Sequence, residues 1–104
     1  MSYVRLTKLA AAPGGLPPET MDERVCGGHT TPGKSIPIGY TVEGYASDPI
    51  EPGSCVCMYR RKRNGVVVDG LFQTSCVKHL TDEGFVTENS VYRVDELPDP
   101  QDQP

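Results

Sequence analysis

Apolar and polar positions alternate along the middle of the chain, which is the pattern of half-buried β-strands. In the segment 35–45, Ile36, Ile38 and Tyr40 share one parity, and Pro37 disfavours a helix. Runs rich in β-branched and aromatic residues predict further strands, which we place at 54–60, 65–73, 77–80, 85–87 and 90–94. The chain therefore reads as a series of short strands separated by turns.

Asn64-Gly65 lies between two of these segments and predicts a two-residue β-hairpin turn. In such a loop Arg63 faces Val66, and this sets the register of the whole hairpin. The register pairs Arg60 with Asp69, Tyr59 with Gly70, Met58 with Leu71 and Cys57 with Phe72. Opposite charges and apolar side chains then face each other, as they do in stable strand pairs.

The fold class predicted from this pattern is all-β: a small antiparallel, partly closed β-barrel of five to seven short strands, because closure removes exposed strand edges. The glycine- and proline-rich start predicts a flexible N-terminal arm over 1–20. A single β-barrel domain is expected over 21–97, with its strands from residue 34 onwards. The polar tail over 98–104 is expected to be disordered.

The chain has 104 residues and a net charge of −4, so it has no general attraction to nucleic acid. The exception is a basic run at the predicted hairpin tip. A binding surface is therefore predicted from Tyr59, Arg60, Arg61, Lys62 and Arg63, with the cations following a phosphate backbone and the tyrosine stacking on a base. The competing interpretation is a solvated tip that charge keeps soluble.

The segment GHTTPGKS, residues 28–35, matches the phosphate-loop pattern G-x-x-x-x-G-K-[ST]. A working loop needs a buried strand before it and a helix after it, because the helix N-terminus supplies amides to the phosphates. Here the preceding residues are charged, and Pro37 and Gly39 follow where the helix would begin. We therefore expect a turn-rich loop and no nucleotide site.

Cysteine and histidine residues form three clusters, Cys26-x-x-His29, Cys55-x-Cys57 and Cys76-x-x-His79. A zinc-stabilised domain using Cys26, His29, Cys76 and His79 is one alternative, although the C-x-x-C spacing typical of zinc sites is missing. The other is that the cysteines pack as small apolar residues. Ser75-Cys76 near His79 gives a weak signal for nucleophilic catalysis, because residues 76 and 79 point to opposite faces of an extended strand.

The segment 40–60 carries Val42-x-Gly44 followed by Ile50-x-x-Gly53-x-x-Val56. This resembles the start of the translation-factor β-barrels that form the second domain of elongation-factor GTPases. The resemblance implies a small closed barrel and transfers no catalytic residue. More loosely, the chain is similar to small β-barrel proteins of bacteria and phages.

Together these observations predict a non-enzymatic interaction module with a protein partner and no cofactor. Nucleic-acid or ribonucleoprotein binding through the hairpin tip is the alternative, and a zinc-stabilised domain is the third. The apolar run Leu9–Ala12 is shorter than the core of a secretion signal, and no run has the length of a membrane span. We therefore expect a cytoplasmic protein with reduced cysteines and no membrane partner.

Overall fold

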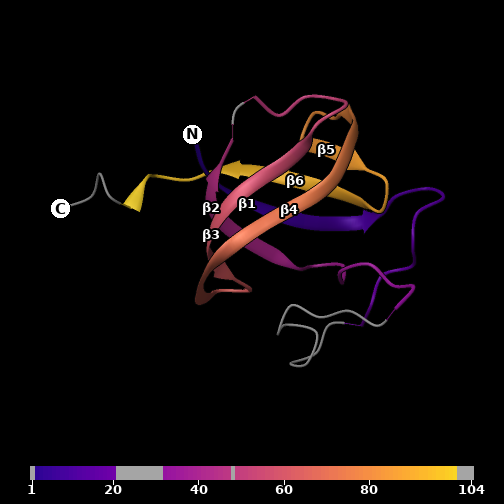
Figure 1. The fold of residues 1–104 in the computed structure, drawn as a ribbon, viewed down its shortest axis with the longest axis horizontal. Helices are drawn as coiled ribbons and strands as arrows, with labels where there is room; N and C mark the ends of the chain where they lie inside the picture. The colour runs from indigo at the N-terminus through magenta and orange to yellow at the C-terminus, as the bar shows by residue number, and fades with distance from the viewer. Residues whose placement is uncertain (1, 21–31, 48, 101–104) are drawn as a thin grey trace.

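Six antiparallel strands form a closed β-barrel in the computed structural model, which describes residues 2–20, 32–47 and 49–100 (Figure 1). The strands are β1 (Ser2–Ala11), β2 (Thr41–Ala46), β3 (Cys55–Arg63), β4 (Val66–Leu80), β5 (Gly84–Thr87) and β6 (Ser90–Glu96). Each strand pairs with the next, and β1 closes the barrel by pairing with β6. The predicted all-β barrel is confirmed, and the described residues contain no α-helix.

The N-terminal segment is a strand of the barrel, so the predicted flexible arm over 1–20 is wrong for residues 2–11. β1 pairs with β2 on one side and with β6 on the other. Its inward positions are Val4, Leu6 and Lys8, all buried. The lysine breaks the apolar alternation, and outward Leu9 adds an apolar residue on the wrong parity, which hides the strand in the sequence.

The β3–β4 hairpin has the predicted turn, with positive φ at Asn64 and Gly65. The predicted register holds beside the turn, where Arg63 pairs with Val66, and is wrong further along. An irregularity between Arg60 and Lys62 shifts the pairing by one residue, because a β-bulge inserts an unmatched residue into one strand. The observed pairs are Arg60 with Gly70, Tyr59 with Leu71, Met58 with Phe72 and Cys57 with Gln73.

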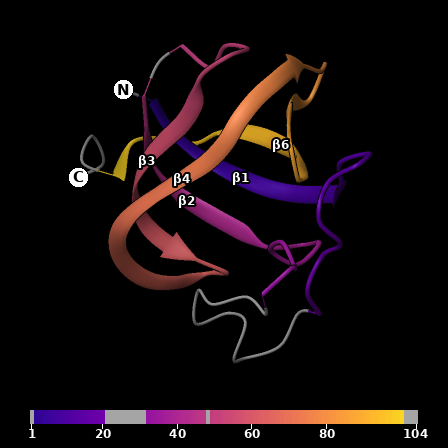
Figure 2. The same cartoon turned by 45° about the vertical axis from the view of Figure 1, so that its right-hand side comes forward.

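Two further segments differ from the prediction. Residues 35–40 precede β2 as a turn, in which the Tyr40 amide donates to the Pro37 carbonyl and Gly39 has a φ of +91°. The segments predicted as 65–73 and 77–80 form one long strand, β4, which pairs first with β3 and then with β5. Figure 2 shows β4 bending across the barrel as it passes from one neighbour to the other.

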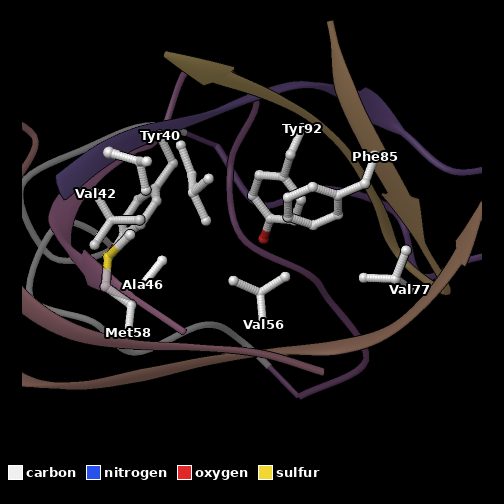
Figure 3. Close-up of a cluster of buried hydrophobic side chains, with 10 residues drawn as sticks. Tyr40, Val42, Ala46, Val56, Met58, Val77, Phe85 and Tyr92 are labelled. Carbon is white, nitrogen blue, oxygen red and sulfur yellow. The ribbon is translucent and has the colours of Figure 1, made fainter. Parts of the chain in front are cut away.

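The core fills the barrel with inward side chains from all six strands and from Tyr40, which precedes β2. Phe85 and Tyr92 come from the paired strands β5 and β6, and their ring centroids lie 5.2 Å apart (Figure 3). Burial raises the pKa of Tyr92 to about 12, so its hydroxyl stays neutral at physiological pH. Close packing of β2 on β3 requires a glycine at position 44, because a Cβ there would clash with the Tyr59 carbonyl oxygen.

Asp99, in the described part of the predicted tail, is hydrogen-bonded to the barrel. The Tyr45 hydroxyl donates a 2.7 Å hydrogen bond to the Asp99 carboxylate. Residues 101–104 lie outside the described residues, as do 21–31. No helix in the described part of the chain is long and apolar enough to cross a membrane.

Candidate functional site

An apolar cleft of about 320 Å³ opens on the outer face of β2, β3 and β4. We call it the Tyr59 cleft; its lining is Tyr45, Ser47, Cys57, Met58, Tyr59, Leu71, Phe72 and Gln73. Strand pairing builds it, because Tyr45 faces Tyr59 and Tyr59 faces Leu71 in one cross-strand row. Leu71 is 84% exposed and Tyr59 46% exposed, so two large apolar side chains meet solvent side by side.

One wall of the Tyr59 cleft is held in place before any ligand arrives. The Tyr45 ring packs edge-on against Tyr3, with centroids 4.9 Å apart, and its hydroxyl donates to Asp99. The same hydrogen bond raises the pKa of Tyr45, because only the protonated hydroxyl can donate. Burial, followed by the charge of Glu43, raises the pKa of Tyr3. Both phenols therefore stay neutral near pH 7.

The four cations of the predicted basic surface have different partners in the fold. Arg60 turns back along β4, where its Nε donates to the Val68 carbonyl at 3.4 Å. Arg61 Nε lies 3.0 Å from Asp69 Oδ1, and Lys62 Nζ lies 4.0 Å from Glu43 Oε2. Arg63 is half-buried opposite Val42. Of the five predicted binding residues, the structure places Tyr59 in the cleft, while two of the four cations have an acidic neighbour.

The hairpin turn is also attached to the barrel. The Asn64 amide donates to the Thr41 carbonyl, and the Thr41 amide donates to Asn64 Oδ1. β2 pairs with β3 up to Arg63, so the tip lies against the start of β2. Hydrogen bonds at Asn64 therefore hold the hairpin turn against β2.

Ser35, the last residue of the phosphate-loop motif, is hydrogen-bonded to the segment 16–17. The Ser35 amide donates to the Pro17 carbonyl, and the Ser35 hydroxyl donates to the Leu16 carbonyl. A turn follows Ser35 at the position where a phosphate loop would continue into a helix, and the Ser35 amide is bonded within the fold. Residues 28–31 of the motif lie outside the described residues.

Lys8 is a buried lysine that the sequence prediction missed. Its side chain is 0% exposed, and Nζ donates to Ser35 Oγ at 2.8 Å and to the Ile36 carbonyl at 2.7 Å. The Lys8 backbone also bonds the same segment, through the Tyr40 carbonyl and the Gly39 amide. Burial lowers the pKa of Lys8 to about 8, because both side-chain partners are neutral oxygens that bring no charge to balance the ammonium.

A second hollow of about 200 Å³ adjoins the residues that hold Lys8. Ser35 and Ile36 line it, together with Phe72 and with hydroxyl and amide side chains of β4, β5, β6 and the turn between β5 and β6. Several of those groups already bond one another: Asn89 Nδ2 donates to Ser75 Oγ at 3.4 Å, and the Thr87 hydroxyl donates to the Ser90 carbonyl at 3.4 Å. Its polar lining therefore serves the fold, and the Tyr59 cleft is the better candidate site.

Of the four residues predicted as possible zinc ligands, two lie within the described residues and two lie outside them. Cys26 and His29 lie outside it, while Cys76 and His79 are both exposed on β4. Within residues 2–20, 32–47 and 49–100, no three His, Cys, Asp or Glu side chains gather as a metal site would need. Cys76 lies instead beside Cys55, with 3.8 Å between the two sulfur atoms.

Comparison with protein-family models, with curated proteins and with solved structures finds no match to this chain. The resemblance to translation-factor barrels therefore stays a prediction. Its motif residues have structural roles here: Val42 and Val56 lie in the core, and Gly53 takes a φ of +91° in the turn before β3.

Proposed function

We propose that this barrel is a non-enzymatic interaction module whose Tyr59 cleft takes an apolar side chain of a protein partner. The observation that carries the proposal is the row Tyr45–Tyr59–Leu71, half-buried at Tyr45 and exposed at Tyr59 and Leu71, around a hollow of about 320 Å³. That volume is at the small end of ligand sites and suits one or two side chains. Fully burying a leucine side chain contributes roughly 1.5–3 kcal/mol. Leu71 is exposed in the free protein, so a partner that covers it would gain this free energy on binding.

The charges around the cleft support a protein partner over a nucleic acid. Arg61 faces Asp69, Lys62 faces Glu43, and Asp99 bonds Tyr45. Protein interfaces combine an apolar centre with a mixed polar rim of this kind. Binding to a phosphate backbone instead depends on cations that can replace the counterions of the polymer.

Selection of binders from a random peptide library displayed on phage, with the purified protein as bait, tests the proposal. We expect selected peptides to share an aromatic or aliphatic anchor and to bind Leu71→Asp at least about tenfold more weakly, which corresponds to 1.4 kcal/mol. Leu80→Asp is the matched control, because Leu80 is also an exposed leucine of β4 but lies outside the cleft.

Two outcomes would contradict the proposal. In the first, peptide binding is equally strong in the wild type and in Leu71→Asp. In the second, no anchored peptide is selected, and a labelled single-stranded oligonucleotide binds in a salt-dependent way that Arg61→Glu abolishes and Leu71→Asp leaves intact. The second result would favour the hairpin as a nucleic-acid surface.

A further inference from the structure

Two cysteines face each other across β3 and β4. Cys55 pairs directly with Cys76 in the strand register, and their Sγ atoms lie 3.8 Å apart. Cys57 lies two residues along β3 and faces Gln73 instead. All three are free thiols in the structure.

The backbone geometry at this pair suits a disulfide bond. Residues directly opposite each other in antiparallel strands have Cα atoms about 4.5–5.5 Å apart, within the range of about 4.4–6.8 Å that disulfides span. The sulfurs need to approach by less than about 2 Å to reach the bonding distance of about 2.05 Å. Rotation of the two side chains is a smaller change than any movement of strands.

We propose that Cys55 and Cys76 are a redox-active dithiol that forms a reversible cross-strand disulfide on the barrel surface. The proposal rests on these two thiols and is independent of the Tyr59 cleft. Cys76 is exposed and Cys55 is half-buried, so a small reagent reaches the pair from solvent. The two sulfurs are already within hydrogen-bonding distance, and this contact raises the pKa of Cys76.

The position of the pair in the fold gives the bond a structural effect. The start of β3 meets β4 here, beside backbone hydrogen bonds that join Val77 to Gly53 and to Ser54. The β3–β4 register is irregular between Cys55 and Cys57, and β4 leaves β3 for β5 just beyond Cys76. A covalent bond at this point would fasten the hairpin at the end opposite its turn.

The oxidant is a low-molecular-weight disulfide, and the reaction is thiol–disulfide exchange. The thiolate of one cysteine attacks a sulfur of the reagent, the reagent's S–S bond breaks, and one small thiol leaves. The second cysteine then attacks the protein sulfur of the mixed disulfide and releases the second small thiol. Two protein thiols lose two electrons and two protons, and the reagent takes up both as it becomes two thiols.

The experiment treats the purified full chain with increasing ratios of oxidised to reduced glutathione, blocks the remaining thiols and weighs the intact protein. We expect Cys55 and Cys76 of the wild type to lose two hydrogens and carry no glutathione, whereas glutathione on Cys57 or Cys26 is independent of this pair. Cys57→Ser and Cys26→Ser are the matched controls and should behave in the same way. Cys55→Ser and Cys76→Ser should instead accumulate a glutathione adduct, because no partner thiol resolves it.

Trypsin mapping of the oxidised wild type gives a second readout that does not depend on the variants folding. Cleavage after Lys and Arg places Cys55 and Cys57 in the peptide 35–60, Cys76 in 64–78 and Cys26 in 25–34. The expected product links 35–60 to 64–78, and dithiothreitol releases it. A stable glutathione adduct on Cys55 or Cys76 of the wild type, a link from either residue to 25–34, or loss of the bond in Cys57→Ser would overturn the proposal.

Discussion

The buried Lys8 should give the barrel a stability that rises in alkaline solution, and replacing Lys8 by Met should remove this rise. Methionine keeps a long unbranched side chain and carries no charge. In the folded protein burial lowers the pKa of Lys8 to about 8, against an ordinary value of 10.5. Below pH 8 both the folded and the unfolded chain hold the proton, and the cost of burying the charge is present in full.

Between pH 8 and 10.5 the unfolded chain keeps the proton while the folded barrel releases it. Stability rises with pH wherever the unfolded state binds more protons, so the free energy of unfolding increases across this window and then levels off. The gap of about 2.5 pKa units corresponds to about 3 kcal/mol, at 1.36 kcal/mol per unit. About 2.5 kcal/mol of this should appear between pH 7 and 10.

Urea unfolding of the wild type and of Lys8→Met at half-unit steps of pH provides the measurement. Other groups titrate in the same range: the pKa values of Tyr3, Tyr45, Tyr92 and Cys76 are all raised in the fold. An acid with a raised pKa loses its stabilising effect as pH rises, which opposes the effect of the lysine. These groups are present in both proteins, so the difference between the two curves isolates Lys8.

Lys8→Met also changes the free energy of unfolding by a constant amount, because it removes the hydrogen bonds that Nζ donates to Ser35 and Ile36. That loss is independent of pH and moves one curve relative to the other without changing its slope. Two curves that stay parallel within about 0.5 kcal/mol from pH 7 to 10 would refute the reasoning. Nζ would then have an ordinary pKa, and Lys8 would not be desolvated in solution.

Three further predictions concern single positions. Gly65→Val should destabilise the barrel by about 1–2 kcal/mol in urea unfolding, because φ is +80° there, and Gly65→Asn should cost less since asparagine tolerates this region. Gly44→Ala should lower the free energy of unfolding by about 1–3 kcal/mol or more in urea, since the alanine Cβ would meet the Tyr59 carbonyl oxygen. An unchanged urea midpoint would argue against close packing of β2 on β3. Titration with ATP and Mg²⁺ should leave the amide resonances of Gly33 and Ser35 unmoved, and saturable shifts lost in Lys34→Ala would restore the phosphate-loop interpretation.

The parts of the fold that local rules determine could be predicted from the sequence. Asn64-Gly65 specifies its turn because both positions need positive φ, and the structure has φ values of +50° and +80° there. The strands predicted at 77–80 and 85–87 are likewise present and are joined by a turn that closes with a bond from the Thr81 amide to the Gly84 carbonyl. The identity of β3, β4, β5 and β6 follows in the same way from β-branched and aromatic content.

Features that depend on distant partners could not be predicted. The bulge near Arg61 reflects how β3 fits β2 and β4 together, and neither strand alone marks it. Lysine is normally exposed, so the sequence places Lys8 within a flexible arm over 1–20 until its acceptors, Ser35 and Ile36, are known. The Tyr59 cleft is similar, because the one-residue shift in register is what brings Leu71 opposite Tyr59.

The place of β1 between β2 and β6 has a consequence for the order of folding. The strands β2 to β6 are joined to their neighbours by consecutive connections, so each can pair soon after it is synthesised. β1 is made first, but one of its two neighbours is the last strand, with Val4 opposite Glu96. Closing the barrel therefore waits for a contact between nearly opposite ends of the chain, which is entropically costly and slow to form. Until then the edges of β1 and β6 stay unpaired, and this interval is when the chain is most open to association with other copies.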